Sequence, residues 1–248
     1  MAYFKYFPKV AYKFGEEASE NTFENISVYA DIIEQVKNDV AAYEEYYILP
    51  GERPDQVSLK LYDTPNYHWS FFLLNDDIKE QGWPLSNENL FRYAEKEYNN
   101  TVLVTRANIA NIFKIGQTVS GLSSGAEAVI KFRDINLGQL WINTPSTGFT
   151  NGETISSQGT GQFADTITLK SSSLQYNAVH HYEDVNGVWN DLGINPVTGN
   201  KEEPAADLTP ITWLDRLNKQ NDKLKKIKVI KPNIIGTIAE SFREAVSL

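Results

Sequence analysis

Three histidines, His68, His180 and His181, are the residues best suited to chemistry, and two of them open the polar and aromatic run His180–Asp184. The chain has no cysteine, so a zinc site would need histidines and carboxylates, and this run supplies both. Adjacent side chains on a strand point to opposite faces, which places His180 and His181 poorly for binding one metal ion. We therefore expect hydrogen-bonded structural histidines here, with no metal and no cofactor.

Patterns that indicate catalysis are weak throughout the chain. No serine precedes a helix in the strained strand-to-helix context that a nucleophilic serine needs. The 32 acidic residues make carboxylate pairs unavoidable, and such pairs alone do not indicate a glycosidase. Ser123-Ser124-Gly125 is followed by no Gly-Lys-Ser/Thr sequence, which favours a turn over a phosphate-binding loop. The sequence assigns no catalytic residue and predicts a protein that is not an enzyme.

Charge is unevenly distributed along the chain. The net charge is −9, and residues 1–100 alone carry 18 acidic against 9 basic residues. Arg216–Lys231 instead holds seven basic residues and one acidic residue, and its apolar spacing predicts a helix. Phosphate contacts need a broad basic surface, so an acidic protein with one basic helix is a poor general nucleic-acid binder. Such a helix suits docking on an acidic protein surface.

The composition indicates a globular chain that folds inside a cell. Hydrophobic residues make up 41% of 248 residues, enough for one large domain or two smaller ones. Met1–Pro8 has no continuous apolar segment typical of a signal peptide, and no apolar run is long enough to span a bilayer. The lack of cysteine excludes disulfides. We expect folding in a reducing cytoplasm, without a membrane or a small-molecule substrate as partner.

Local signals predict the elements of the main body. Residues 1–24 are rich in aromatic residues and predict an extended arm that packs on its own domain or on a partner. Tyr46–Leu49 is typical of a strand, and Pro54 suits the first turn of a helix. Asp63–Asn66 consists of turn-forming residues that end this helix before a second helix that contains Trp69. Ser86 then suits the N-cap of a third helix.

An internal repeat marks residues 101–175. Gly116–Ser120 matches Gly152–Ser156, and in both copies a glycine follows nine residues after the first glycine and an alanine twelve residues after it. Charge falls in this stretch, and Gly, Ser and Thr increase between short apolar segments. Two units with glycines in register predict a small pseudo-symmetric β-barrel or sandwich. We expect it to be an inserted domain.

The C-terminal part predicts two helices. Thr212 begins the first, with Asp215 in the capping-box position. An apolar stripe that includes Trp213 and Leu224 predicts that this helix continues through the basic run as far as Ile227 and beyond. Pro232 then begins the last helix.

The succession strand, helix, helix, strand around residues 50–98 resembles a LysM module, a sugar-binding fold in many proteins. Its ending, Trp83-Pro84-Leu85-Ser86, is similar instead to the LysM-like core of a baseplate wedge protein of contractile-tailed phages of the T-even type. The likeness covers residues 1–98 and 176–248 and leaves residues 101–175 as an insertion. It is carried by four places, which are Phe7-Pro8-Lys9-Val10, Gly51-Glu52-Arg53-Pro54 through Leu61-Tyr62 and His68-Trp69, His180–Asp184, and Ile227–Pro232.

The resemblance implies an α+β protein in three parts. These are an N-terminal arm and LysM-like core (1–100), an inserted all-β domain (101–175), and a return segment with flanking helices that completes the main body (176–248). It implies a structural component of the virion tail, assembled in the host cytoplasm. Several copies would dock on the helical wedge core and on the adjacent wedge in a six-fold assembly.

By analogy with that family, twelve residues would lie on contact surfaces. They are Trp83, Pro84, His180, His181, Tyr182, Glu183, Asp184, Arg216, Lys225, Lys226, Lys228 and Pro232.

Two alternatives remain open at this point. One is a peptidoglycan-binding LysM-type module of a phage lytic or attachment protein, in which Tyr62, Tyr67, Trp69 and Trp83 stack on sugars. Trp69 shares a helical stripe with apolar residues and suits the core, whereas Trp83 precedes Pro84 in a turn and is the better candidate for an exposed contact. The other alternative is a chaperone that assists tail assembly and then leaves.

Overall fold

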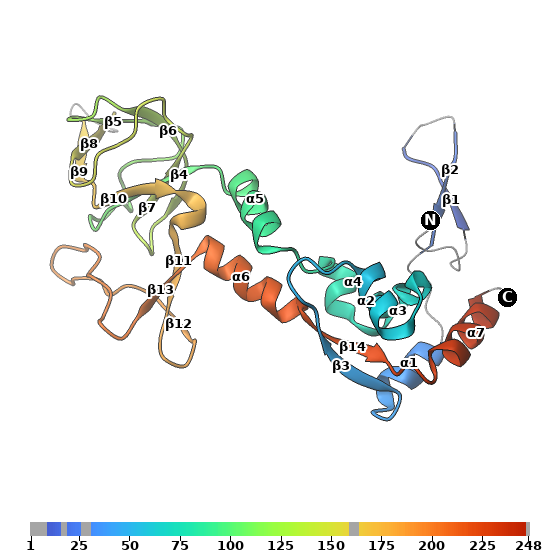
Figure 1. Cartoon of the computed structure of the whole chain (residues 1–248). Coiled ribbons are helices and arrows are strands. Elements are labelled where there is room, and N and C mark those ends of the chain that lie inside the picture. Colours follow the sequence, from blue (N-terminus) through green and yellow to red (C-terminus); the bar gives the residue numbers. More distant parts are fainter. Residues whose placement is uncertain (1–8, 16–18, 26–30, 159–163, 247–248) are drawn as a thin grey trace. The chain divides into compact units, whose positions relative to one another are not determined.

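The computed structural model describes residues 9–15, 19–25, 31–158 and 164–246 of the chain. The chain divides into two compact units, the first within residues 1–87 and 220–248 and the second made of residues 88–219. Both contain helices and strands, so the fold class is α+β, as predicted (Figure 1). None of the helices within these ranges combines the length and the apolar composition that crossing a bilayer requires.

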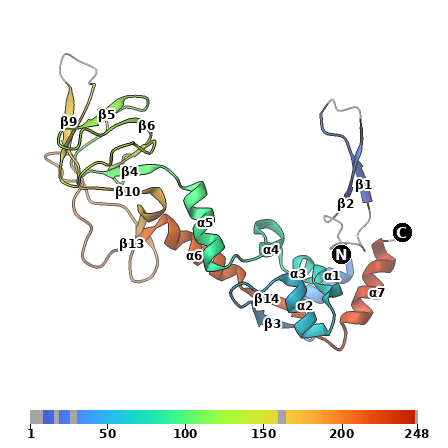
Figure 2. The ribbon, with the colours of Figure 1, turned by 45° about the horizontal axis from the view of Figure 1, so that its top comes forward.

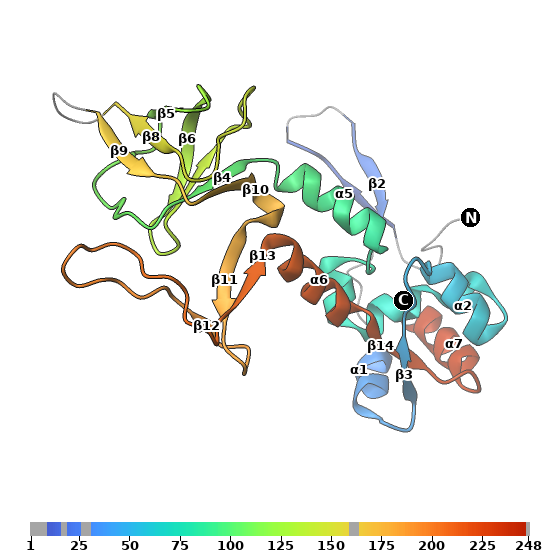
Figure 3. The ribbon, with the colours of Figure 1, turned by 60° about the vertical axis from the view of Figure 1, so that its left-hand side comes forward.

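The first unit is built on two antiparallel strands from opposite ends of the chain (Figures 1 and 3). Strand β3 (Tyr43–Tyr47) pairs with β14 (Lys226–Ile230) along its whole length. Side chains alternate on β14, where Ile227 and Val229 are buried and Lys226 is exposed. One face of this strand therefore belongs to the core, and the sheet closes only when the C-terminal segment returns to the N-terminal one.

Three α-helices follow β3 and supply the core that covers this sheet. They are α2 (Pro54–Tyr62), α3 (Trp69–Leu74) and α4 (Asp76–Gln81), with a 3₁₀ turn, η1 (Pro65–Tyr67), before α3. Helix α2 begins at Pro54 as predicted, and it ends at Asp63, whose φ of 57° lies in the left-handed region. One apolar cluster joins these helices to β14 and consists of Ile48, Val57, Phe71, Ile78, Leu224, Ile227 and Val229.

Asn75, the residue between α3 and α4, links these helices to β14 by hydrogen bonds in both directions. Its Nδ2 donates to the backbone carbonyls of Phe71 and Lys228, both at 2.8 Å, and its Oδ1 accepts from the Lys228 N–H at 2.7 Å. Nearby, the Tyr62 hydroxyl donates to the Ile230 carbonyl at 2.8 Å, and burial raises the pKa of this phenol. The C-terminal strand is thus held by side chains more than 150 residues away.

Two further helices, α1 (Asp31–Asn38) and α7 (Ile235–Val246), extend the core of the first unit. The Trp69 ring of α3 stacks on the Phe242 ring of α7, with centroids 4.8 Å apart. Ile33 of α1 belongs to the same buried cluster. Trp69 is therefore a core residue, in agreement with its position on the predicted apolar stripe.

The N-terminal arm contains an antiparallel hairpin of β1 (Lys9–Tyr12) and β2 (Asn21–Glu24) (Figure 2). Three of its aromatic rings, Tyr12, Phe14 and Phe23, meet edge to face with centroids 5.0 and 5.6 Å apart. All three side chains remain exposed. The expected arm is thus a paired hairpin within the described part of residues 1–24, and Phe7-Pro8 lies outside the described residues.

Seven strands form one antiparallel sheet in the second unit, in the order β10-β4-β7-β6-β5-β8-β9. The edge strands β9 and β10 are joined by Leu169 and Lys170 alone, and the Lys170 N–H donates to the Val104 carbonyl on β4. The sheet therefore curls back on itself around one apolar core. The strands are β4 (Thr101–Val104), β5 (Thr118–Gly121), β6 (Glu127–Asp134), β7 (Gln139–Ile142), β8 (Thr154–Ser157), β9 (Asp165–Thr168) and β10 (Ser171–Leu174).

The repeat predicted from the sequence has a structural counterpart at the centre of this sheet. Strands β5 and β8 pair antiparallel, and Ser120 lies opposite Ser156, its equivalent in the other copy. Each of the two strands pairs on its other side with the strand that follows it. The repeats begin at Gly116 and Gly152, whose φ values of 87° and 83° favour glycine. Gly161, the counterpart of Gly125, lies outside the described residues.

Glu153 occupies the position that Gln117 has in the first copy of the repeat, so that a buried carboxylate replaces an amide there. Like Gln117 in the first copy, it accepts a hydrogen bond from the backbone N–H three residues before it, at 2.6 Å. Its carboxylate also accepts from the N–H groups of Ser123 and Ser124 and from the Ser124 hydroxyl, at 2.9 to 3.1 Å. Burial raises the pKa of Glu153, but these hydrogen bonds outweigh it and the net pKa is lowered.

A three-stranded sheet and two helices complete the second unit. The sheet has the order β12-β11-β13, and α6 continues directly from β13 (Figure 3). Helix α5 begins where the first unit ends, and the unit boundary at residues 219 and 220 falls within α6. The elements are α5 (Asn87–Glu97), β11 (Val179–Glu183), β12 (Trp189–Asn190), β13 (Thr209–Thr212) and α6 (Trp213–Leu224), with a 3₁₀ turn, η2 (Gln175–Asn177), before β11.

Two expectations about the main body are wrong. The strand that pairs with β3 is β14, and the Trp83-Pro84-Leu85-Ser86 segment leads into α5 instead. The basic run Arg216–Lys231 is not one helix, because α6 ends at Leu224 and a strand follows. Ile227 fits the helical stripe, but the residues around it alternate, and β-branched residues favour a strand when a partner strand is present.

The boundaries of the units also differ from those expected at residues 100 and 175. Residues 88–100 and 176–219 belong to the second unit. One reason is visible in Tyr98, whose ring packs on that of Trp213 with centroids 4.9 Å apart. The seven-stranded sheet itself lies within the residues expected for the β-domain.

Replacing Asn75 by alanine should open the pairing of β14. The Lys228 N–H and carbonyl would each lose a hydrogen bond to the Asn75 side chain, at a cost of about 2 kcal/mol or more. Hydrogen–deuterium exchange measured by mass spectrometry should then be faster in residues 43–47 and 226–230 and unchanged in residues 101–174. Lys79→Ala, at an exposed position of α4, is the control. Equal protection in the two variants would contradict the role given to Asn75.

Replacing Glu153 by glutamine should destabilise the second unit by about 1.5–3 kcal/mol, because an amide has one accepting oxygen, whereas Oε2 accepts from the two serine N–H groups and Oε1 from the Thr150 N–H. The lowered pKa means that the carboxylate stabilises the fold above its unfolded pKa, and that this contribution is lost as pH falls through the folded pKa. Urea unfolding should therefore separate wild type from variant at pH 7 and less so in acid. Gln117→Glu, at the equivalent partly buried site, is the control, and a constant difference at all pH values would argue against this assignment.

Candidate functional site

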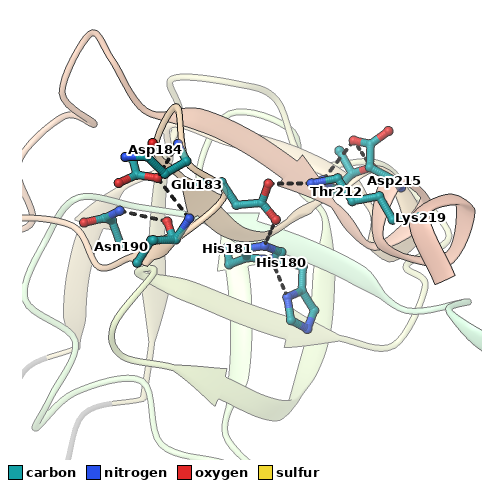
Figure 4. Close-up of polar contacts among 10 residues, drawn as sticks. His180, His181, Glu183, Asp184, Asn190, Thr212, Asp215 and Lys219 are labelled. Atoms are coloured by element: carbon teal, nitrogen blue, oxygen red, sulfur yellow. Dashed lines mark hydrogen bonds and ion pairs between the residues drawn. The ribbon is translucent and has the colours of Figure 1, made fainter. Parts of the chain in front are cut away.

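Residues His180–Glu183 lie on β11, the central strand of the three-stranded sheet, and Asp184 directly follows it (Figure 4). The pairing of β11 with β13 shifts register between Val179 and His181. Such irregularities re-aim side chains, and the two histidine rings meet, with 2.9 Å between their Nδ1 atoms. The expectation that His180 and His181 point to opposite faces is therefore wrong.

The two histidines end a chain of polar contacts that begins at Lys219 on α6. The Lys219 ammonium donates to the Glu183 carboxylate, and Glu183 Oε1 lies 2.8 Å from His181 Nε2. The Glu183 carboxylate accepts from His181 Nε2–H, and one of the two Nδ1 atoms donates to the other. The hydrogen bonds from Lys219 and then His181 lower the pKa of Glu183. Burial, followed by the charge of Arg216, lowers the pKa of His180 to about 4.

The neighbouring polar residues have structural roles. Asp184 Oδ1 accepts from the N–H groups of Asn186 and Val188, at 2.8 and 2.9 Å, and shapes the turn between β11 and β12 (Figure 4). Thr212 and Asp215 form the predicted capping box at the start of α6, in which each backbone N–H donates to the other side chain at 3.0 Å.

A cavity of about 510 Å³ lies beside the two histidines. Its size falls within the range of small-molecule sites. Its lining residues come from five segments of the second unit and are Phe132, Asp134, Asn136, Leu137, Trp141, His180, His181, Trp189, Asn190, Asp191 and Trp213.

Aromatic rings in contact with one another form most of the apolar wall. Trp141 lies between Phe132 and Trp213, with ring centroids at 4.9 and 5.3 Å, and Trp213 meets His180 at 4.4 Å. Trp189 stacks on His181 at 4.0 Å with an interplanar angle of 27°. Ring contacts of this kind favour defined orientations, so the wall is organised without a bound molecule.

The twelve residues predicted for contact surfaces differ widely in exposure. Four are buried in their own unit and offer little surface to a partner, namely Pro84, His181, Tyr182 and Lys225. Trp83 is half-buried, since its Nε1 donates to the Glu52 carbonyl at 2.7 Å and its ring lies against Phe71 and Phe72. Lys226 and Pro232 are exposed, and the partly buried positions are Trp83, His180, Glu183, Asp184, Arg216 and Lys228.

Sequence reasoning found the histidine run and missed the aromatic cavity beside it. The tryptophans at 141, 189 and 213 lie on three elements that no local spacing connects. A second pattern was also missed, because Gly121-Leu122-Ser123-Ser124-Gly125 has the letters of a Gly-x-Ser-x-Gly elbow. In the structure it is a turn between β5 and β6 that binds the Glu153 carboxylate, and no helix follows it.

No family model matches this sequence, and no curated protein matches it. Within the described ranges, no group of three or more histidine, aspartate or glutamate side chains is arranged to hold a metal ion. The chemistry of the site therefore has to be inferred from its own side chains, and these are suited to binding by ring contacts and hydrogen bonds.

His180 should make the second unit less stable in weak acid. Its folded pKa of about 4 lies below the ordinary value of 6.5, so the unfolded chain binds more protons between these values and stability falls as pH drops from about 6.5 to about 4. An NMR titration should give the imidazole a pKa near 4. His180→Gln should remove this part of the pH dependence in urea unfolding. A pKa near 6.5 would refute the explanation.

Proposed function

We propose that this chain is a structural component of the baseplate wedge of a contractile phage tail, which docks on the wedge core and joins neighbouring wedges around the hub. The observation that carries the proposal is a contact between two of the segments on which the family resemblance rests. Tyr62, from one of the resembling segments, donates its hydroxyl proton to the carbonyl of Ile230 in another. Segments far apart in the sequence thus form one structural unit.

The order of elements in the first unit also supports the proposal. Strand β3, helices α2 and α3, and strand β14 occur in the strand, helix, helix, strand order of a LysM-like core, with α4 as an additional short helix after α3. The second unit enters this order before the closing strand. We take the second unit as an insertion into this order, which leaves β3, α2, α3 and β14 together in the first unit and places His180–Asp184 in the second.

Exposed apolar groups on the N-terminal hairpin are consistent with a protein that has neighbours. Tyr12 and Phe14 are 56% and 50% exposed, and interfaces are enriched in aromatic residues. Lys226 adds an exposed basic side chain, which pairs with Glu45 at 2.9 Å. Several moderate contacts of each copy, combined with ring closure, would raise the effective concentration of the last contacts to form. The proposed role needs no catalysis.

No contact among the described residues of the first unit favours the alternative of a glycan-binding LysM module. The aromatic side chains considered for sugar stacking are used in packing. Trp69 is 1% exposed, and Tyr62 packs against Tyr67 and Phe71. Trp83 is oriented by its bond to the Glu52 carbonyl. We therefore do not assign sugar binding to this unit.

Quantitative mass spectrometry of purified virions tests the proposal. With a tail protein of known stoichiometry as the reference, the chain should be present at about six copies per particle or a small multiple, as a closed six-fold ring requires. Particles that lack the chain, while infected cells contain it in quantity, would reject a permanent wedge component and favour an assembly chaperone.

A further inference from the structure

We propose that the aromatic cavity of the second unit binds a pyranose sugar, as a mono- or disaccharide unit of a glycan. The proposal concerns residues of the second unit alone and does not depend on the wedge proposal. It rests on the kinds of side chain that meet in the cavity, on their exposure, and on the charge of its lining.

Two aromatic side chains of the cavity are available to a ligand. Trp189 is 59% exposed and Phe132 is 48% exposed, although both line a concave site. His181 covers one face of the Trp189 ring in a nearly parallel stack and holds its orientation. The C–H groups on one face of a pyranose ring carry partial positive charge and pack well on the electron-rich face of an aromatic ring.

Polar groups of the same cavity match the hydroxyl groups of a sugar. Asp134 uses one carboxylate oxygen to accept from the Leu137 N–H at 2.9 Å, which leaves the other for a ligand. Asn190 donates from Nδ2 to the Val188 carbonyl at 2.9 Å and keeps its Oδ1. Asn136 and Asp191 are exposed side chains of the lining. Carboxylates accept and carboxamides both donate and accept, as a polyhydroxylated ligand requires.

The charge of the cavity disfavours anions, and its hydrogen-bonding groups disfavour a quaternary ammonium ion. Its lining contains two aspartates and neither lysine nor arginine, and the lowered pKa of His180 keeps that ring neutral at pH 7. Anions such as phosphate esters are therefore repelled. A quaternary ammonium ion could sit among aromatic rings beside carboxylates, but it forms no hydrogen bonds and would leave the two carboxamides unused. A neutral saccharide can pack on the aromatic rings and also form hydrogen bonds with the carboxylates and carboxamides.

The five tryptophans of the chain provide an internal readout for the test. Full-length protein labelled with ¹⁵N should show five indole Nε1–H signals. Titration with maltose, cellobiose, lactose or N,N′-diacetylchitobiose should shift the signals of Trp141, Trp189 and Trp213. The signals of Trp69 and Trp83, which belong to the first unit, should stay in place.

Variants at exposed positions separate binding from folding. Trp189→Ala should weaken binding of the best sugar about tenfold or more, as expected for the loss of a ring contact. Asp191→Ala should also weaken it. Phe91→Ala removes an exposed ring of the same unit outside the cavity and should bind as wild type does. The remaining indole signals of each free variant report whether the fold is intact.

Three results would overturn the proposal. The first is no shift with any of the four sugars at concentrations up to about 10 mM, where even a weak site with a millimolar dissociation constant is occupied. The second is a response of the three signals to choline chloride and to none of the sugars, which would identify a cage for a cation. The third is equal sugar affinity in Trp189→Ala and Phe91→Ala.

Discussion

The pairing of β3 with β14 is the constraint on which the rest of the first unit depends. The two strands are separated by most of the chain, and the buried face of β14 completes a core that α2, α3 and α4 leave open. The entropic cost of closing a loop grows with its length, although only slowly. Most of the contacts that hold β14 are apolar and do not fix its position along the core. The hydrogen bonds of Asn75 and Tyr62 do, since they bind the backbone of β14 at particular residues.

The second unit reduces this cost by holding its own ends together. Tyr98, just after α5, packs on Trp213 at the start of α6, so the segments that enter and leave this unit are in contact. A similar contact is present in the first unit, where Asn221 exchanges two hydrogen bonds with the backbone of Leu85, at 2.8 and 3.0 Å. The effective loop between β3 and β14 is therefore much shorter than the sequence separation, and an insertion of this size is compatible with the sheet.

Sequence signals were reliable where a structure is determined by neighbours in the chain. Pro54 begins α2, Thr212 and Asp215 cap α6, and the repeat around Gly116 recurs as a paired strand because turns and caps depend on a few adjacent residues. The predictions were wrong or absent where residues distant in the sequence determine the local structure. Ile227 fits a helical stripe equally well until β3 is known to lie beside it. The aromatic cavity had no local signal, because its tryptophans come from separate elements.

The position of β14 near the end of the chain has a consequence for synthesis on the ribosome. Residues 88–219 are made after most of the first unit and before its closing strand. At about 5–20 residues per second, their translation lasts on the order of ten seconds. During that interval the edge of β3 and the side chains of Phe71 and Val57 have no closing partner. At its end the second unit has all the residues of its own core, whereas the first still lacks β14. The second unit can therefore complete its core before the first, although its residues are made later.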